Sequence, residues 1–156
     1  MILGANHIAI SVPDLERGID FYCTQLGFEK VMEAGWPEGT ETADRILAVK
    51  GTSARVVHLR TTNLLIEMFQ FVAGNPAPQD PNRPVIDHGL THLCLAVQDI
   101  DAEYARLMAA GMRFHSEPTR LGPRLRTVYG RDPFGNVIEL EESAGRVQPH
   151  EAPNLA

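Results

Sequence analysis

The sequence of 156 residues has little basic charge and no long apolar segment. Its formal net charge of −6 argues against nucleic acids and anionic membrane surfaces as partners. A small anionic substrate is not excluded, because it senses only the local field. The longest charge-free segment, residues 1–13, is too short to span a bilayer. We therefore expect a small-molecule substrate, no nucleic-acid partner and no membrane association.

Cysteine is also scarce, since only Cys23 and Cys94 are present, without the spacing of a metal or redox motif. Reduced, buried thiols in a cytoplasmic protein are the simplest interpretation. The first residues lack the basic start and the small-residue cleavage site of a signal peptide. Both observations favour a cytoplasmic location and a fold that needs no disulfide bonds.

One short segment occurs twice. Residues 7–14 read HIAISVPD and residues 92–99 read HLCLAVQD, so a histidine opens each copy and an aspartate closes it. Each copy has the pattern of a short strand, and its aspartate can cap a following helix. Downstream of each copy lies an apolar strand with a glutamate inside it, Glu67 in the first half and Glu139 in the second. This internal duplication is the strongest indication of the fold.

The two halves are predicted to fold as two βαβββ modules, in an α+β protein. In the first half, strands are expected over residues 7–12, 28–34, 54–61 and 64–72, with a helix from Asp14 to Gly27 and a short helix over 42–49. In the second half, strands are expected over residues 91–97, 112–116, 125–130 and 136–141, with a helix over 100–110 that Gly111 ends. A tight Thr-Asn connection is expected between the last two strands of the first half.

Residues 73–88 are rich in proline and polar residues and are predicted to form an extended linker. The predicted organisation is one domain over residues 1–142, made of module one (1–72), this linker and module two (89–142). The remaining residues, 143–156, are expected to form a C-terminal tail.

Strand alternation places the two histidines and the two glutamates on matching faces. His7 and His92 lie on the less apolar face of their strands. Glu67 and Glu139 are flanked by apolar residues that must point into a helix-covered core, which leaves both carboxylates on the opposite face. An unpaired buried carboxylate is costly, and one divalent cation offsets that cost for both. Any one of these residues alone would be read as structural, but together they predict a site for one Ni, Co, Fe, Mn or Zn ion.

Four groups of residues add a family resemblance. They are His7-Ile8-Ala9-Ile10 with Pro13-Asp14, Phe21-Tyr22 to Leu26-Gly27-Phe28, Gly89-Leu90-Thr91-His92, and Asp132-Pro133-Phe134-Gly135-Asn136 leading to Ile138-Glu139. Together, over residues 6–142, they resemble the vicinal oxygen chelate superfamily, which includes glyoxalase I, methylmalonyl-CoA epimerase, extradiol dioxygenases and antibiotic-resistance proteins. The resemblance implies a U-shaped, partly closed mixed sheet around a metal cavity, with His7, Glu67, His92 and Glu139 as the ligands.

The resemblance implies a metal-dependent lyase or isomerase of the glyoxalase I or epimerase type. A metal with two open positions can bind two adjacent oxygens of an α-oxygenated carbonyl substrate and stabilise an enediolate, while a carboxylate moves the proton. By similarity to glyoxalase I, Glu139 is the expected base. The epimerase branch would use a further acid in the first half, for which Glu38 and Glu41 are the candidates.

Two other functions stay open. Fe(II) dioxygenases of the superfamily usually hold the metal with two histidines and one glutamate, whereas Glu67 fills the fourth position here. Metal-free drug-binding members normally lose the ligands. A dioxygenase is therefore the second hypothesis and a metal-free binding protein the third. The ligand set does not separate a lyase from an epimerase, and it identifies neither the metal nor the substrate.

Five residues are predicted to contact the substrate. Phe69 shares the face of Glu67, where Trp36 is a second candidate for an apolar wall, and Cys94 shares the face of His92. The other three belong to a group of arginines in an otherwise acidic chain: Arg120, Arg124 and Arg126. These arginines suit a carboxylate or phosphate group, and a solvated surface is the competing interpretation.

The remaining histidines, His58, His88, His115 and His150, have no equivalent in the other half and are expected to be structural or exposed. Because related proteins often form dimers, a homodimer is also expected.

Overall fold

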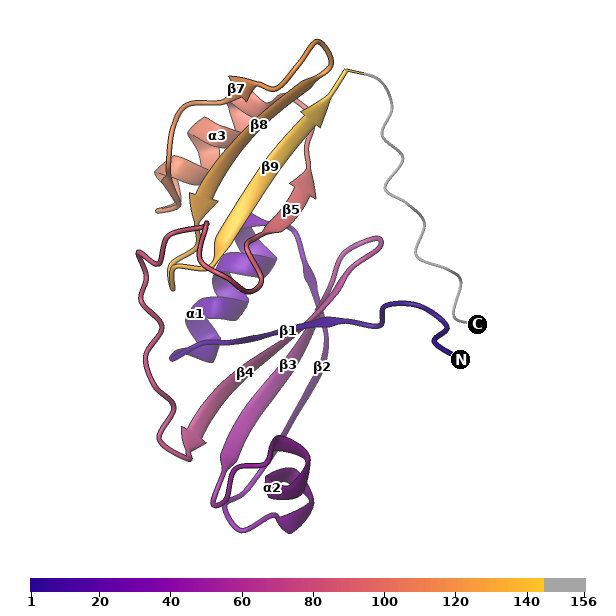
Figure 1. Ribbon diagram of the computed structural model, residues 1–156, viewed down its shortest axis with the longest axis vertical. Helices are drawn as coiled ribbons and strands as arrows, with labels where there is room; N and C mark the ends of the chain where they lie inside the picture. Colours follow the sequence, from indigo (N-terminus) through magenta and orange to yellow (C-terminus); the bar gives the residue numbers. More distant parts are fainter. Residues whose placement is uncertain (145–156) are drawn as a thin grey trace. The chain divides into compact units, whose positions relative to one another are not determined.

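The computed structural model describes residues 1–144 (Figure 1). These residues form two compact units, with the boundary between residues 78 and 79. Each unit contains one copy of the repeated segment. His150 and the predicted tail, apart from its first two residues, lie outside the described part of the chain. Among the described helices, none has the length and apolar character that crossing a membrane requires.

The first unit has the predicted βαβββ order. Its elements are β1 (Ile8–Ser11), α1 (Leu15–Ile19), η1 (Asp20–Gln25), β2 (Glu29–Trp36), α2 (Glu41–Leu47), β3 (Ser53–Arg60) and β4 (Leu65–Ala73). The four strands form one sheet in the order β1-β4-β3-β2. β1 runs parallel to β4, and the other neighbours are antiparallel. The first and last strands of the module are therefore neighbours.

The expected long helix of the first half is divided in two. α1 has only five residues and continues into the π-helix η1. The predicted stop is confirmed, since Gly27 has a φ of +74°. The short helix α2 ends earlier than expected, because Ala48 already adopts the left-handed conformation with a φ of +55°.

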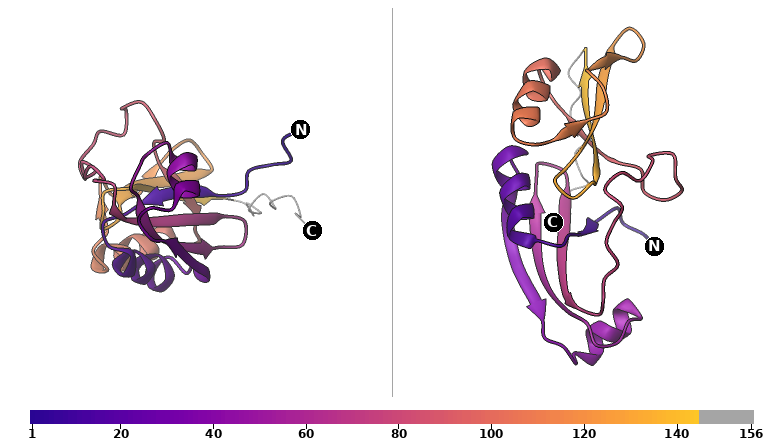
Figure 2. Two further views of the ribbon diagram at one scale, coloured as in Figure 1. Left: turned by 90° about the horizontal axis from the view of Figure 1, so that it is seen from below. Right: turned by 90° about the vertical axis from the view of Figure 1, so that its left-hand side faces the viewer.

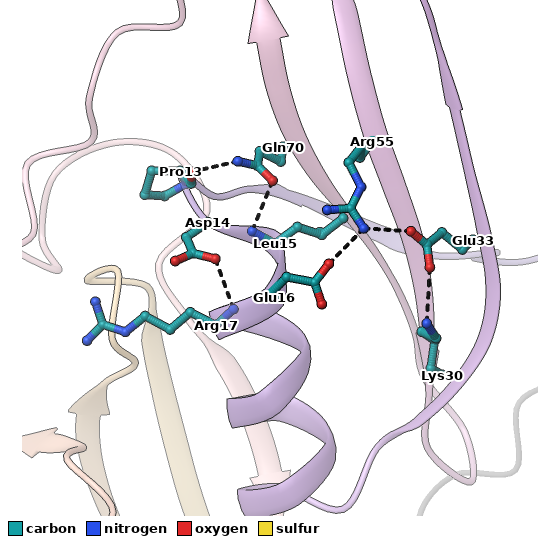
Figure 3. Close-up of polar contacts among 9 residues, drawn as sticks. All are labelled: Pro13, Asp14, Leu15, Glu16, Arg17, Lys30, Glu33, Arg55 and Gln70. Atoms are coloured by element: carbon teal, nitrogen blue, oxygen red, sulfur yellow. Dashed lines mark hydrogen bonds and ion pairs between the residues drawn. The ribbon is translucent and has the colours of Figure 1, made fainter.

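Side chains from two strands hold the start of α1 (Figure 3). The Asp14 carboxylate accepts a hydrogen bond from the Arg17 backbone N–H at 3.0 Å, as a helix cap does. Gln70 of β4 accepts from the Leu15 N–H at 3.3 Å and donates its amide to the Pro13 carbonyl at 3.0 Å. Arg55 of β3 donates to Glu16 and Glu33, both at 2.7 Å. The helix start is thus fixed to the sheet by polar contacts.

The second unit repeats the order with shorter inner strands. Its elements are β5 (Leu93–Ala96), α3 (Ile100–Ala109), β6 (Arg113–Phe114), β7 (Thr119–Arg120), β8 (Leu125–Arg131) and β9 (Val137–Ser143). The sheet order is β5-β9-β8-β6, with β7 paired to β8. β5 is parallel to β9, as β1 is to β4. β7 was not predicted, because a strand of two residues has no alternation to recognise.

The start of α3 is held in the same way as that of α1. Asp99 accepts a hydrogen bond from the Ala102 N–H at 3.2 Å, as predicted for a cap. The Glu142 carboxylate of β9 accepts from the Asp99 N–H at 2.6 Å and from the Ile100 N–H at 3.3 Å. Glu142 follows Glu139 by three residues, and Gln70 follows Glu67 by three. The repeat therefore includes the strand residue that ties the helix to the sheet.

Each sheet is covered on one face by its own helix (Figure 2). The residues buried there are mostly aliphatic and aromatic. In the first unit they include Leu15, Phe21, Tyr22, Val57, Leu59, Ile66 and Met68, and in the second Ile100, Leu107, Met112, Val128, Ile138 and Leu140. Burial of these side chains supplies most of the stabilising free energy of each unit. The other face of each sheet carries the candidate metal ligands.

Part of the predicted linker belongs to the second unit. Between β4 and β5 the structure has neither helix nor strand, as expected. Arg131, which is buried, donates to the Arg83 carbonyl at 2.7 Å and to the Gly135 carbonyl at 2.9 Å. Residues 79–88 are therefore attached to module two and do not form a free spacer.

The thiols are free as predicted, but Cys23 is half-buried and Cys94 is exposed, because Cys94 lies on the uncovered face of β5. The two sheets are hydrogen-bonded separately and neither closes on itself. The α+β class is confirmed, and the U-shaped closure around a metal cavity stays a prediction.

Candidate metal centre

His7 and Glu67 lie together in the first unit. His7 directly precedes β1, and Glu67 lies in β4, opposite Ala9 of β1. The Nε2 atom of His7 is 3.3 Å from Oε2 of Glu67. Ile66 and Met68 are 1% and 0% exposed on the helix side, so Glu67 points to the other face, as alternation predicts. The parallel pairing of β1 and β4 brings this pair together.

His92 and Glu139 form the equivalent pair in the second unit. Nε2 of His92 is 3.0 Å from Oε2 of Glu139, and Glu139 lies opposite Cys94 of β5. Ile138 and Leu140 are buried on the helix side of β9. Glu139 itself is buried, whereas Glu67 is half-buried. The predicted site residues are therefore paired within each module.

The outer nitrogens of the two histidines are also bound alike. Nδ1 of His7 is hydrogen-bonded to Oδ1 of Asn6 at 2.8 Å, and Nδ1 of His92 to Oγ1 of Thr91 at 3.0 Å. In both cases the partner is the preceding residue. Metal-binding histidines commonly use their second nitrogen in this way, which orients the ring. Each Nε2 atom is thus directed toward its glutamate.

The donor atoms suit a divalent metal. Adjacent ligands of a six-coordinate ion with bonds of about 2.1 Å lie about 3 Å apart. The two His–Glu pairs have separations of 3.3 and 3.0 Å. Imidazole with carboxylate is also the donor set that Mn, Fe, Co, Ni and Zn accept. Each pair therefore fits two adjacent positions on such an ion.

The second oxygen of each glutamate has its own partner. Oε1 of Glu67 is 3.1 Å from Nε2 of His58 on β3. Oε1 of Glu139 accepts a short hydrogen bond from the Thr127 hydroxyl on β8. In both modules, one carboxylate oxygen faces the repeated histidine and the other is held from the neighbouring strand.

His58 was expected to be structural, and its place beside Glu67 was missed. The information was present in the predicted Thr-Asn connection, where the Thr61 N–H donates to the Leu64 carbonyl at 2.9 Å. Counting outward from that pair along an antiparallel hairpin places His58 opposite Glu67, which is the observed register. Tyr129 occupies the equivalent position opposite Glu139.

Two titratable groups near Glu139, the Cys94 thiol and the Tyr129 hydroxyl, are held in their neutral forms. Partial desolvation raises the pKa of the Cys94 thiol to about 12, and the charges of Glu139 and Glu141 act in the same direction. The pKa of Tyr129 is raised as well, first by burial and then by Glu139. The rings of Tyr129 and His92 lie 4.9 Å apart. Cys94, Glu139 and Glu141 also offer atoms within 4.8 Å of one another, but the thiol is protonated at neutral pH.

An aromatic cluster continues the face of Glu67. The Phe69 and Phe71 rings stack with centroids 5.4 Å apart, and the Trp36 ring lies 6.1 Å from each of them. All three share the face of Glu67, because the register pairs Trp36 with Ala54 and Ala54 with Phe71. Phe69 is therefore placed as the sequence predicted, with Trp36 beside it.

The arginines lie elsewhere. Arg126 forms two hydrogen bonds of 2.7 Å with Asp101 of α3, so it points to the helix side of β8, away from the face of Glu139. Arg120 is its cross-strand partner on β7 and is exposed, as is Arg124 in the following loop. The structure does not bring Arg126 to Glu139, because its guanidinium is occupied on the other face. A substrate role for Arg120 and Arg124 stays a prediction.

The remaining candidates are dispersed. Glu38 and Glu41 are exposed, in the loop before α2 and at its first residue. His88 is exposed at the end of the predicted linker. The pKa of His115 is lowered by burial and by the nearby Arg131 and Arg113. None of these residues contacts a site pair through an observed hydrogen bond or ion pair in residues 1–144.

Comparison with known proteins identifies the family of the chain. The family model of the Glyoxalase/Bleomycin resistance protein/Dioxygenase superfamily matches residues 4–140. The chain belongs to this superfamily. The match covers both modules, so the predicted resemblance is confirmed.

Three proteins illustrate the similarity. A 2-epi-5-epi-valiolone epimerase from Actinomyces sp is 32% identical over 148 residues, which cover 88% of this chain and 78% of the epimerase. A glyoxalase family protein from Bacillus cereus has the same fold with a TM-score of 0.84 and 24% identity, over 93% of this chain and 97% of its own. A variant of the fosfomycin resistance protein FosX from Listeria monocytogenes, complexed with Mn(II) and 1S,2S-dihydroxypropylphosphonic acid, has a TM-score of 0.61 and 19% identity, over 94% of each chain.

Proposed function

We propose that this protein is a metal-dependent isomerase of the glyoxalase and epimerase type. It moves a proton at a carbon next to a carbonyl group in an α-oxygenated substrate. The observation that carries the proposal is the occurrence of two His–Glu pairs at equivalent positions of the two modules, with separations of 3.3 and 3.0 Å. The similarity to an epimerase over most of the chain supports this reaction class.

In this proposal His7, Glu67, His92 and Glu139 hold one divalent ion. Four side chains leave two of six positions for adjacent substrate oxygens. The ion would supply Lewis acidity to those oxygens, on which negative charge develops when the proton leaves. Mn(II) in the structurally similar FosX complex supports a metal of this kind, and Fe, Co, Ni and Zn suit the same ligands.

Glu139 is the proposed base. Its carboxylate is the more buried of the two, so less water competes for the proton. Thr127 holds one of its oxygens, and the other lies 3.0 Å from Nε2 of His92, on the side where the metal and the substrate would bind. Tyr129 and the Cys94 thiol have raised pKa values and stay protonated near it, so they add no negative charge.

Glu67 and His58 are proposed to have a positioning role in the other module. With Nε2 of His58 at 3.1 Å from one oxygen, the carboxylate is oriented so that its other oxygen faces His7. This pairing also argues against the dioxygenase hypothesis, because a site with two histidines and one glutamate has no use for a second, oriented carboxylate. A metal-free binding protein would not require a His–Glu pair at equivalent positions of both modules.

The metal part of the proposal is tested by stoichiometry. Apo protein titrated with Mn(II) or Co(II) in a calorimeter should bind one ion per chain with a Kd below about 10 μM, equivalent to roughly 7 kcal/mol. Glu67→Gln and Glu139→Gln should each weaken binding of that same ion. Two independent ions per chain, or no binding by the wild type, would overturn the shared site.

The reaction is tested by isotope exchange. The Mn(II)-loaded protein is incubated in D₂O with methylmalonyl-CoA or the methylglyoxal–glutathione hemithioacetal, and deuterium at the substrate carbon is followed by NMR. Exchange that requires Glu139 and stops with EDTA is expected. Oxygen uptake with catechols and Fe(II) would instead favour the dioxygenase. Light scattering tests the predicted homodimer separately.

A further inference from the structure

The first unit contains a pocket farther along the strands that carry the candidate metal ligands. It lies between α2 and the C-terminal ends of β1 and β4 and has a volume of about 270 Å³. Most of its lining is apolar, including Leu47, Val49, Phe71 and Ala73. An apolar cavity of about 150 Å³ already accommodates benzene. The α2 pocket, as we call it, therefore has room for an aromatic ring or a short alkyl chain.

The α2 pocket opens on the same face of the sheet as the His7–Glu67 pair. Phe71 alternates in phase with Glu67 along β4, and Ser11 alternates in phase with His7 along β1. Because β1 and β4 are parallel, both strands run from the ligand pair toward the pocket. At about 3.3 Å per residue, Phe71 lies about 13 Å along the strand from Glu67.

Aromatic rings lie between Glu67 and the α2 pocket. Phe69 stands between Glu67 and Phe71 on the same face, and its ring stacks on that of Phe71. Trp36 packs against both from β2. An apolar substituent that extends from the ligand pair to the pocket would therefore lie along a continuous aromatic surface.

The wall formed by α2 is firmly held. The Asp44 carboxylate accepts hydrogen bonds from the Gly51 and Thr52 N–H groups at 2.7 and 3.0 Å and from the Thr52 hydroxyl at 2.9 Å. The Trp36 indole donates to the same hydroxyl at 3.1 Å. These contacts fix the segment that carries Leu47 and Val49, so the pocket is already formed without a ligand. α2 has no counterpart in the described part of the second module.

We propose that the α2 pocket binds an uncharged alkyl or aryl substituent of the substrate, about six to nine carbon atoms in size. The reacting carbons of that substrate lie at the His7–Glu67 end. The position of the reacting part rests on the proposed function, whereas binding of the apolar part needs no metal. The pocket would thus select substrates that carry an apolar group beyond their oxygenated carbons.

Trp36 provides a direct measurement, because it is the single tryptophan of the chain and contacts Thr52 of the pocket. Metal-free protein is titrated with linear alkanols from 1-butanol to 1-decanol while Trp36 fluorescence is recorded. The Kd should fall about threefold to fourfold for each added methylene and level off when the pocket is full, near 1-octanol. Val49→Asp should raise the Kd for 1-octanol at least tenfold. Ile46→Asp, on the exposed side of α2 and outside the pocket, is the matched control and should change it less than twofold.

Several outcomes would overturn the proposal. They are a Kd that does not depend on chain length, equal effects of the two variants, and loss of self-association in Val49→Asp with unchanged 1-octanol binding. The last would make the pocket a contact between copies. Failure of the proposed metal-dependent function can be told apart from failure of the pocket proposal, because alkanol binding would persist in a protein that binds no metal. Failure of alkanol binding in a protein that binds one metal ion would remove the pocket proposal alone.

Discussion

Nε2 of His58 lies 3.1 Å from Oε1 of Glu67, while Nε2 of His7 lies 3.3 Å from Oε2 of the same carboxylate. The glutamate is thus held from the strands on both sides of β4. The orientation of a ligand carboxylate by a neighbouring side chain contributes strongly to metal affinity in proteins.

His58→Ala should weaken Mn(II) binding about 10- to 100-fold, because Glu67 loses the group that orients it. His58→Gln, whose amide can still donate to Oε1, should recover part of the loss. Calorimetric titration measures both, and thermal unfolding checks that the variants are folded. The control is Met32→Ala on the other side of His58, which removes a half-exposed side chain from the same face. Unchanged affinity in His58→Ala would show that the contact has no role in metal binding.

Asp44 predicts an acid-sensitive contribution to stability. Hydrogen bonds from the Thr52 and Gly51 N–H groups and the Thr52 hydroxyl lower the pKa of this carboxyl in the folded protein. The stabilisation is therefore complete above the pKa of the unfolded chain, about 4, and is lost as the pH falls through the lower folded value. The difference in urea midpoint between wild type and Asp44→Asn should be largest at neutral pH and shrink below about pH 4. A difference that grows on acidification would contradict this prediction.

Gly135 should not tolerate a side chain. Its φ is +98°, and an added Cβ would lie 2.4 Å from the backbone Cα of Pro81. Strain and overpacking together should cost about 2–5 kcal/mol in Gly135→Ala. Gly122→Ala is the control, because Gly122 also has a positive φ of +74° but no atom within 4 Å of an added Cβ. That variant should lose only about 1–2 kcal/mol in denaturant unfolding. Similar losses in both would mean that residues 79–88 do not pack closely on this turn.

Glu142→Ala should destabilise the second unit by about 1–2 kcal/mol, because two N–H groups at the start of α3 lose their acceptor. Glu142→Gln keeps an acceptor, as Gln70 does in the first unit, and should lose less. Glu103→Ala removes a glutamate that pairs with Arg106 on the exposed surface of α3, and it should cost under about 0.5 kcal/mol. Urea unfolding compares the three, and equal losses would argue against the capping role.

The repeat made most of the fold predictable. Strand alternation around Glu67 and Glu139, together with the capping aspartates, predicted the faces and the helix starts that the structure shows. Alternation describes one strand at a time, so it did not reveal the neighbour across the hairpin. His58 was therefore missed, although hairpin register would have placed it. The register between β8 and β9 was also needed to see that Arg126 points to the helix side, where it pairs with Asp101.

The shared use of one ion by both modules could not be read from spacing alone and stays a prediction. The α2 pocket was also beyond the sequence patterns. Its walls come from segments without periodicity, and hydrogen bonds of Asp44 fix their shape. Such contacts depend on the course of the loop, which composition does not specify.

The parallel pairing of β1 with β4 has a consequence for folding. Glu67 comes 60 positions after His7, and Glu139 comes 47 positions after His92. Each pair therefore joins the two extremities of its module and is completed only when the last strand docks, after a large loss of chain entropy. Formation of a His–Glu pair and complete folding of its module are then one cooperative event. A chain released from the ribosome before β4 is synthesised therefore lacks the His7–Glu67 pair that would bind the metal.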